Sequence, residues 1–281
     1  MKYFYENRSG SFYNNIQVSI YENINLNYLA HWHNDAELTY VREGTICIGV
    51  NNQKFTLTEG DMGVFNSGDI HYYETTNVPS KLLTLVFNTE FIGLSSNWPP
   101  KGRFVSPFIP KSVIENSELA NIKHILLKIL KENKSQNKYY ELFIKAGLNE
   151  ICGLLLRNLD IENNERESNS SRIRIMQKVF GYIEDNYQLD ISLQSIANNF
   201  NIDPYNLSKD FNLLTGTNLK TYINTLRLFK AEDMILNTNK DITDIALDSG
   251  FNSIRSFNRA FKQLKGYTPS SLRHNKSERK P

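Results

Sequence analysis

The sequence has few cysteines and no long apolar run. Its only cysteines are Cys47 and Cys152, so it has neither a disulfide framework nor a paired cysteine motif for metal. Nowhere do about 18 apolar residues follow one another, as a membrane-spanning helix requires. The N-terminal stretch MKYFYENRSG also lacks the apolar run of a secretory signal. We therefore expect a cytoplasmic protein that does not enter a membrane.

The sequence also lacks the motifs of common catalytic classes. It shows no nucleophile constellation, no phosphate-cradling glycine-rich loop and no nucleotide fingerprint. What is present is an ordinary globular composition of 281 residues, 40% hydrophobic and 22% charged, which is enough for about two domains. We expect no enzyme and no cofactor.

Positive charge is concentrated in the second half of the chain. Residues 172–281 carry 16 Lys and Arg against 11 Asp and Glu, whereas residues 1–171 carry 16 against 19. Within residues 253–280, eight cationic side chains are accompanied by Glu278 as the sole acid. Such a cluster forms either a solvated surface or a phosphate-facing one, and charge alone does not choose between them.

Apolar periodicity divides the chain into a β part and an α part. Residues 16–90 alternate apolar and polar side chains in short runs between turns, which predicts antiparallel strands. Apolar residues then recur at helical spacing around 119–132 and 139–158. The polar segment 161–171 has almost nothing to bury, so it is interpreted as a linker. Everything after it has helical periodicity.

The helical part contains an internal repeat. Apolar positions recur 49 residues on in the first helix of each copy and 50 residues on in the second helix. Each copy has a turn, at Asn201 or Gly250, where left-handed backbone is tolerated. The pattern predicts two helix-turn-helix motifs, at about 193–214 and 242–264, with a plain helical bundle as the alternative. The matched pairs are Leu193 and Ile242, Ile196 and Ile245, Ala197 and Ala246, Ile202 and Phe251, Leu207 and Phe257, Phe211 and Phe261, and Gly216 and Gly266.

The second helix of each motif has a polar outward face. With Leu207 and Phe211 turned to the core, a 3.6-residue period places four polar side chains outside in each copy, none of them acidic. Side chains of these types read base edges and neutralise phosphates. The residues expected to bind DNA are Tyr205, Ser208, Lys209 and Asn212 in the first motif and Arg255, Asn258, Arg259 and Lys262 in the second.

A single helix is expected between the two motifs. The segment from Leu219 to Leu236 is rich in apolar residues and contains no Gly or Pro. At ~1.5 Å per residue such a helix spans about 27 Å, close to the ~34 Å between successive major grooves on one face of DNA. One rigid strut would therefore hold two reading heads in adjacent grooves.

The C-terminal part resembles a known family. The run GFNSIRSFNRAFKQLKGYTPSSLR (250–273) resembles the signature of AraC-type transcriptional regulators, and SLQSIANNFNIDPYNLSKDF (192–211) with LRLFKA (226–231) resembles the rest of that domain. Asn201 stands where the family usually has Gly, and Arg255-Ser256 where a Ser-aromatic pair is common. The resemblance implies binding to promoter or operator DNA, contact with RNA polymerase, and transcriptional control, usually activation, governed by the N-terminal domain.

The N-terminal part resembles the two cupin motifs, which run here as His31-x-His33-x3-Glu37-x6-Gly44 and Gly60-x5-Asn66-x-Gly68-x2-His71. Asn66 replaces the usual Pro, and Thr75 the usual closing Asn. Imidazole and carboxylate groups suit a divalent transition metal, and strands of a small barrel can aim them into one cavity. Three interpretations stay open, namely the polar lining of an effector pocket, a metal site, or structural histidines. All three concern His31, His33, Glu37 and His71.

These patterns together predict an α+β protein, with an N-terminal antiparallel β-barrel, a helical pair and an all-α C-terminal domain. We expect a cupin-like effector-sensing domain (1–100), a helical connector (101–160), the linker (161–171) and a DNA-binding domain (172–281). One connector helix is expected to pair with its copy in a homodimer, unless both simply cover the barrel. The expected function is transcriptional activation in response to a small-molecule effector such as a sugar. The alternative is a metal-dependent cupin enzyme, an oxygenase or isomerase, with a helical appendage.

Overall fold

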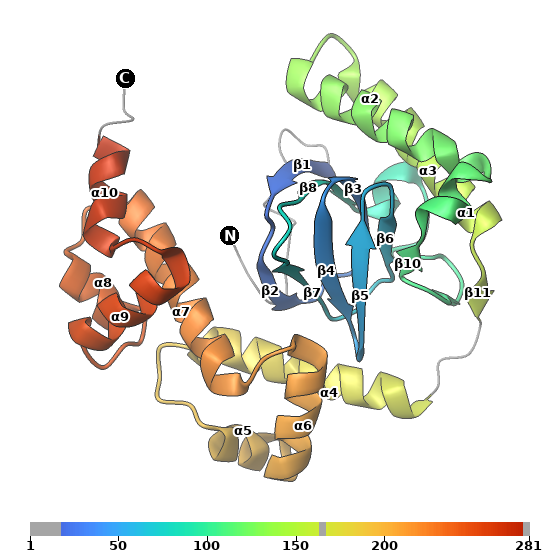
Figure 1. Cartoon of the computed structure of the whole chain (residues 1–281). Coiled ribbons are helices and arrows are strands. Elements are labelled where there is room, and N and C mark those ends of the chain that lie inside the picture. The colour runs from blue at the N-terminus through green and yellow to red at the C-terminus, as the bar shows by residue number, and fades with distance from the viewer. Residues whose placement is uncertain (1–17, 163–166, 278–281) are drawn as a thin grey trace. The chain divides into compact units, whose positions relative to one another are not determined.

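The computed structural model describes residues 18–162 and 167–277. The chain forms two compact units that divide between Arg174 and Ile175. The first unit contains the strands and the helices α1 to α3, and the second is helical (Figure 1). Within the described ranges, none of the helices combines the length and the apolar character that a membrane span needs. The predicted α+β architecture is confirmed.

The strands of the first unit form antiparallel sheets. A five-stranded sheet has the order β1-β8-β3-β6-β10, a four-stranded sheet has the order β2-β7-β4-β5, and β9 pairs with β11. The bounds are β1 (Val18–Ile24), β2 (Tyr28–His31), β3 (Ala36–Glu43), β4 (Thr45–Val50), β5 (Gln53–Thr58), β6 (Met62–Phe65), β7 (His71–Thr75), β8 (Lys81–Phe87), β9 (Arg103–Phe104), β10 (Phe108–Ile109) and β11 (Ile161–Glu162).

The two faces of the five-stranded sheet are buried in different ways, because successive side chains of a strand point to opposite sides. On the inner face, Val41 and Leu82 pack with Ile46, Ile48 and other residues of the four-stranded sheet. On the outer face, Leu38 and Leu85 belong to a second apolar cluster, which continues into the helices. The barrel therefore has a core inside it and another on its outer surface.

Helices α2 and α3 supply the other half of this outer core. Ile125, Leu126 and Ile129 of α2 are buried in it, and so are Leu148 and Ile151 of α3. The apolar stripes of both helices thus cover the sheet, which was the alternative to pairing in a homodimer. The helical elements of this unit are η3 (Thr89–Ile92), α1 (Lys111–Glu115), η4 (Glu118–Asn121), α2 (Ile122–Ser135) and α3 (Tyr140–Asn158).

The segment 161–171, predicted as a linker, is structured at both of its ends. Ile161 pairs with Phe104 in a short ladder and packs against the outer core, and helix α4 already begins at Glu167. Residues 163–166 lie outside the described residues. The linker itself stays a prediction, and one apolar residue suffices to anchor a two-residue strand at its start. A helix whose later turns bury Val179 and Phe180 can also extend backwards through polar residues.

The second unit begins within α4 and contains both predicted helix-turn-helix motifs. Local capping explains where several of these helices begin: Ser192, Asp203, Asn218 and Ser253 each accept a hydrogen bond from a backbone N–H of the following turn. The bounds are α4 (Glu167–Asn186), α5 (Leu193–Phe200), α6 (Pro204–Thr215), α7 (Leu219–Asn237), α8 (Ile242–Asp248), α9 (Ile254–Lys265) and α10 (Pro269–Ser277).

The turns inside the two motifs have the predicted left-handed backbone. Asn201 has a φ of 52° and Gly250 a φ of 90°. Asn tolerates this region better than most residues with a side chain, because its short amide forms local hydrogen bonds. Asn201 therefore replaces the usual Gly without loss of the turn.

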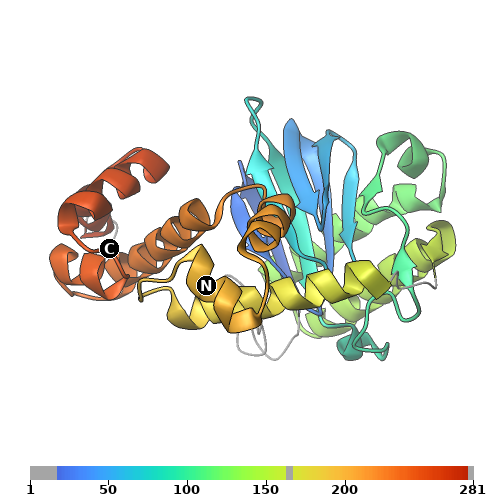
Figure 2. The same cartoon turned by 90° about the horizontal axis from the view of Figure 1, so that it is seen from below.

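Helix α7 contributes to the cores of both motifs. Near its start, the ring of Tyr222 packs against Phe180 and Phe211, with centroids 5.6 and 5.1 Å apart. Near its end, Ile235 and Leu228 belong to the core of the second motif. In Figures 1 and 2, α7 lies between the α5–α6 pair and the α8–α9 pair. Its 19 residues span about 28 Å at ~1.5 Å per residue.

Candidate functional site

The residues predicted to bind DNA lie on the outer faces of α6 and α9, the two reading helices. Leu207, Phe211, Phe257 and Phe261 are fully buried, so the opposite face of each helix is turned to solvent. Ser208 is half-buried. The exposed members of the set are Tyr205, Lys209, Asn212, Arg255, Asn258, Arg259 and Lys262.

The two reading helices differ in charge. Helix α6 presents Lys209 beside uncharged Tyr205 and Asn212, whereas α9 presents Arg255, Arg259 and Lys262. Arginine can contact guanine through two hydrogen bonds, and Lys and Arg both neutralise phosphate. The second helix therefore carries the greater positive charge, and the first has more neutral hydrogen-bonding groups.

The four predicted residues of the barrel meet in one buried cluster. His31 ends β2, Glu37 belongs to β3 and His71 begins β7, while His33 lies in the turn between β2 and β3. Their potential ligand atoms all lie within 4.8 Å of one another, and each of the four residues is 3% exposed or less. We call this group the His/Glu cluster.

Backbone carbonyls orient the three imidazole rings. Nδ1 of His31 lies 3.0 Å from the carbonyl of Leu29, and Nδ1 of His71 lies 2.9 Å from the carbonyl of Asp69. Nδ1 of His33 likewise lies 3.1 Å from the carbonyl of Asp35. A carbonyl only accepts, so Nδ1 is the donor in each of these contacts. Hydrogen bonds that Nδ1–H donates in this way are the usual support of metal-binding histidines.

The carboxylate of Glu37 joins the cluster through short contacts. Its Oε2 lies 2.9 Å from Nε2 of His33 and 3.4 Å from Nε2 of His71. Burial by itself raises the pKa of Glu37, but His71 and His33 outweigh it and hold this pKa well below its usual range. Burial alone would lower the pKa of His71, but the neighbouring carboxylate of Glu37 outweighs the effect of burial and raises this pKa. Glu37 is therefore an anion that draws positive charge into the barrel.

A polar track leads away from the cluster inside the barrel, and the sequence patterns missed it. The hydroxyl of Tyr73 donates to Oε1 of Glu37 and lies 2.6 Å from Oγ1 of Thr39. Thr39 in turn lies 3.3 Å from Thr84, which accepts from Asn23. Tyr73 follows His71 by two residues on β7, so its position on the same face was visible in the strand period. The hydrogen-bonding partners depend on cross-strand register, which the sequence did not provide.

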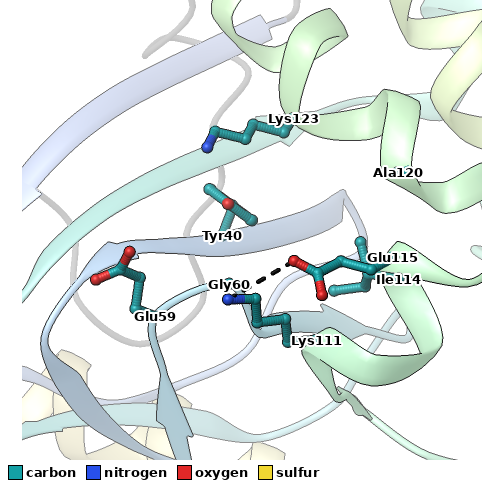
Figure 3. A pocket seen from close by; sticks show the side chains of 8 residues that line it. All are labelled: Tyr40, Glu59, Gly60, Lys111, Ile114, Glu115, Ala120 and Lys123. Carbon is teal, nitrogen blue, oxygen red and sulfur yellow. Dashed lines mark ion pairs between the residues drawn. The ribbon is translucent and has the colours of Figure 1, made fainter.

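A separate groove of about 220 Å³ lies between the barrel and α1 (Figure 3). Tyr40 and Lys123 line it, together with Lys111 and Glu115, whose Nζ and Oε1 are 3.6 Å apart. None of the predicted site residues lines this groove. Its cations and acids are mixed, so it has no concentrated charge for a phosphate or a metal.

Sequence comparison matches both parts of the chain to known domains. Residues 196–275 match the helix-turn-helix domain and residues 27–86 match the cupin domain. The HTH-type transcriptional activator RhaS of Escherichia coli O157:H7 is 24% identical over 249 residues, which cover 86% of this chain and 86% of RhaS. RhaS of Shigella sonnei has the same identity and coverage.

Solved structures also resemble the chain. A Listeria innocua protein of unknown function is 32% identical and covers 36% of this chain and 96% of its own, with a TM-score of 0.34. ToxT from Vibrio cholerae O395 is 14% identical and covers 92% of this chain and 97% of its own, with a TM-score of 0.47. On the domain matches and the similarity to RhaS over 86% of each chain, this chain is a homologue of the AraC-type transcriptional activators, with a cupin domain followed by a helix-turn-helix DNA-binding domain.

Proposed function

We propose that this protein activates transcription by binding an operator through both reading helices, under the control of a ligand in the barrel. One observation carries the DNA-binding part: each reading helix exposes non-acidic polar side chains opposite a buried face, and α7 joins the two motifs. Its length of about 28 Å is close to the ~34 Å repeat of the major groove. Both helices can therefore enter grooves on one side of a duplex.

The test is to select genomic DNA fragments with the purified full-length protein and to titrate the recovered sequence against competitor DNA. We expect two half-sites about one helical turn apart and a steep loss of affinity with salt, since Lys and Arg displace counterions from phosphate. Retention of all fragments equally would contradict the proposal. Transcription from the recovered promoter, with the protein present and absent, then separates activation from repression.

The His/Glu cluster and the polar track support a ligand site within the barrel. One nitrogen from each of three imidazoles and one carboxylate oxygen lie within 4.8 Å of one another, and the neighbouring Tyr73, Thr39 and Thr84 supply hydroxyl groups. Hydroxyls, imidazoles and a carboxylate are partners for a small polar metabolite such as a sugar. This is the effector site that we propose for His31, His33, Glu37 and His71.

The same four residues fit a divalent transition metal. Nitrogen and oxygen ligands bind such ions at about 2.0–2.2 Å, and the observed spread of 4.8 Å is close to twice that distance. Nε2 of His71 is buried and lies 3.4 Å from Oε2 of Glu37, so an imidazole nitrogen and a carboxylate oxygen already stand side by side. A bound ion would hold oxygen atoms of an effector by Lewis acidity. His31, His33, Glu37 and His71 would hold the ion.

Metal-dependent catalysis is the alternative use of this site. A catalytic metal keeps a position open for substrate, whereas all four side chains here are 3% exposed or less. The burial favours a resident ion or effector over turnover, and we propose that the protein is not an enzyme. Conversion of any bound metabolite by the metal-loaded protein would overturn this part of the proposal.

A homodimer and contact with RNA polymerase complete the proposal. The apolar stripes of α2 and α3 pack against the barrel. Helix α3 also carries Leu142 and Phe143, whose exposed fractions are 66% and 49%. Leu127 of α2 is exposed as well. Neighbouring exposed apolar side chains on a pair of helices suit pairing with a second copy. Contact with polymerase is inferred from the activator function of the relatives.

A further inference from the structure

Arg227, near the middle of α7, binds the loop that follows α4. Its Nε donates to the carbonyl of Tyr187 over 2.7 Å, and its Nη2 donates to the carbonyl of Leu189 over 2.8 Å. The planar guanidinium therefore joins two carbonyls of one loop at once through two separate nitrogens, a fixed fork that lysine lacks because its donors share one nitrogen. We call residues 187–189 the bridge loop.

The bridge loop also touches the turn of the second helix-turn-helix motif. Gln188 donates from its side-chain amide to the carbonyl of Asp248 over 2.8 Å. Gly250 lies so close that an added Cβ would be 2.8 Å from Cα of Gln188 and 2.9 Å from Nε of Arg227. Glycine is thus required here both by its φ of 90° and by the approach of the loop.

Two ion pairs further along α7 also join this helix to its neighbours. Nζ of Lys230 lies 3.5 Å from Oε1 of Glu184 in α4. Nζ of Lys265, at the end of α9, lies 2.6 Å from Oε2 of Glu232. All four side chains are only about one-fifth exposed, so solvent screens these pairs less than it screens fully exposed ones. Positions 227–232 of α7 are therefore tied both to the α4 side and to the second motif.

We propose that Arg227 is a positioning residue that fixes the second motif relative to the first, and so sets the spacing of half-sites that the protein accepts. This inference rests on the proposed binding of DNA by both reading helices. Arg227 belongs to neither reading helix, and its guanidinium is engaged by the bridge loop. Its effect on DNA binding acts through the geometry of the two motifs.

The distance between the two reading helices must match the spacing of the half-sites closely. If the reading helices occupy grooves about 34 Å apart, a rotation of about 10° of one motif against the other at the middle of the strut displaces one reading helix relative to the other by about 3 Å. That displacement is close to the rise of one base pair, about 3.4 Å. A small loosening at the bridge loop would therefore let the protein accept operators whose half-sites are one base pair too close or too far apart.

The experiment uses the full-length protein and two substitutions that disturb the bridge loop differently. Arg227→Lys keeps the charge but loses the forked contact, and Gly250→Ala pushes a methyl group into the loop. Gly266→Ala is the matched control for Gly250→Ala, because Gly266 has a φ of 79° and no atom lies within 4 Å of an added Cβ. Thermal unfolding of each variant establishes that it is folded.

Each protein is titrated with the selected operator, with versions one base pair longer or shorter between the half-sites, and with versions that retain a single half-site. For the wild type we expect altered spacing to weaken binding by about tenfold or more. For Arg227→Lys and Gly250→Ala, we expect the native operator to bind about tenfold more weakly, with single half-sites unchanged and the spacing preference reduced. Tenfold corresponds to about 1.4 kcal/mol, close to the lower end of the range for hydrogen bonds to a charged group. Gly266→Ala should keep the wild-type spacing preference.

Three results would overturn the inference. Full spacing preference in folded Arg227→Lys and Gly250→Ala would show that the bridge loop does not set the geometry. An equal loss on single half-sites and on the full operator would assign Arg227 to DNA contact or to the fold of one motif. A wild type indifferent to the second half-site would refute the proposed two-helix binding itself, and this inference with it.

Discussion

The hydroxyl of Tyr73 donates to Oε1 of Glu37 over 2.5 Å, between two strands that belong to different sheets of the barrel. The other oxygen of Glu37 faces His33 and His71. One carboxylate therefore contacts both the imidazole cluster and the polar track. A ligand that binds at either end would change the hydrogen bonding at the other. The contacts of Glu37 should therefore respond to ligand binding at both ends.

Glu37→Ala and His71→Ala should change the response of the protein to its ligand and leave the DNA-reading surface intact. A ligand shifts a regulatory equilibrium only through unequal affinity for its two states, and these variants remove groups that make that difference. Operator titrations of the folded variants, with effector present and absent, are the measurement. Nearly identical curves are expected under the two conditions, in contrast to the wild type.

Metal binding can be measured separately, because an ion bound only to the folded state raises the melting temperature. If the cluster holds an ion, chelation should lower the Tm of the wild type, and addition of Zn²⁺, Ni²⁺ or Mn²⁺ should restore it. Glu37→Gln, which lacks the anionic oxygen, should respond much less. Tyr73→Phe is the control, since it removes a hydrogen bond to Glu37 but no ligand atom. The same response in wild type and Glu37→Gln would place the metal elsewhere.

Arg259→Ala should weaken operator binding by about 1–3 kcal/mol if Arg259 reads a base. A charge removed from an exposed helix face changes folding stability by only about 0.5 kcal/mol or less. Lys240→Ala is the matched control, because it removes a cation of the same unit that lies outside both reading helices. Normal operator binding by Arg259→Ala, together with loss of binding by folded Glu37→Ala in all conditions, would refute the division into reader and sensor.

Residues 172–281 should bind the operator without the barrel. They contain both reading helices, α7 and the residues of α4 that pack on it. The expected result is retention of the same genomic fragments that the full-length protein selects, with lower affinity if dimerisation contributes. A folded fragment that shows no preference among genomic fragments would count against the assignment of the reading surface.

The full-length protein should form a dimer at micromolar concentration, and Leu142→Ser with Phe143→Ser should weaken it. Both side chains are exposed on α3, so their replacement removes apolar area from the surface without opening the core. Sedimentation with and without operator DNA is the measurement. A wild type that remains monomeric in both conditions excludes the proposed assembly.

The two cysteines should differ in reactivity towards an alkylating reagent at pH 8.5. Burial raises the pKa of Cys152 to about 12, so almost no reactive thiolate is present, whereas Cys47 is partly accessible. Mass spectrometry should find one label per native chain and two per denatured chain. Rapid labelling of Cys152 in the native protein would show that α3 separates from the barrel.

Periodicity and spacing predicted much of this structure because the relevant signals are local. The left-handed backbone at Asn201 and Gly250 was visible in the local turn chemistry of each motif. The two cupin motifs predicted that His31, His33 and His71 could lie close together, as they do. The contacts of Tyr73 and Arg227 were missed, because they depend on strand register and on the path of a loop that lies about 40 residues from Arg227 in the sequence. The short strand and the helix start at the two ends of segment 161–171 were not foreseen, because low apolar content was taken to mean absence of regular structure.

The apolar outer face of the five-stranded sheet has a consequence for where the chain can be cut. Leu38, Leu85 and Val64 are buried only together with residues of α2 and α3. A protein shortened near residue 110 would keep every strand of the barrel except β11 and yet present that face to water. Such an exposed patch invites aggregation, so a soluble, separately expressed sensor must extend at least through Asn158.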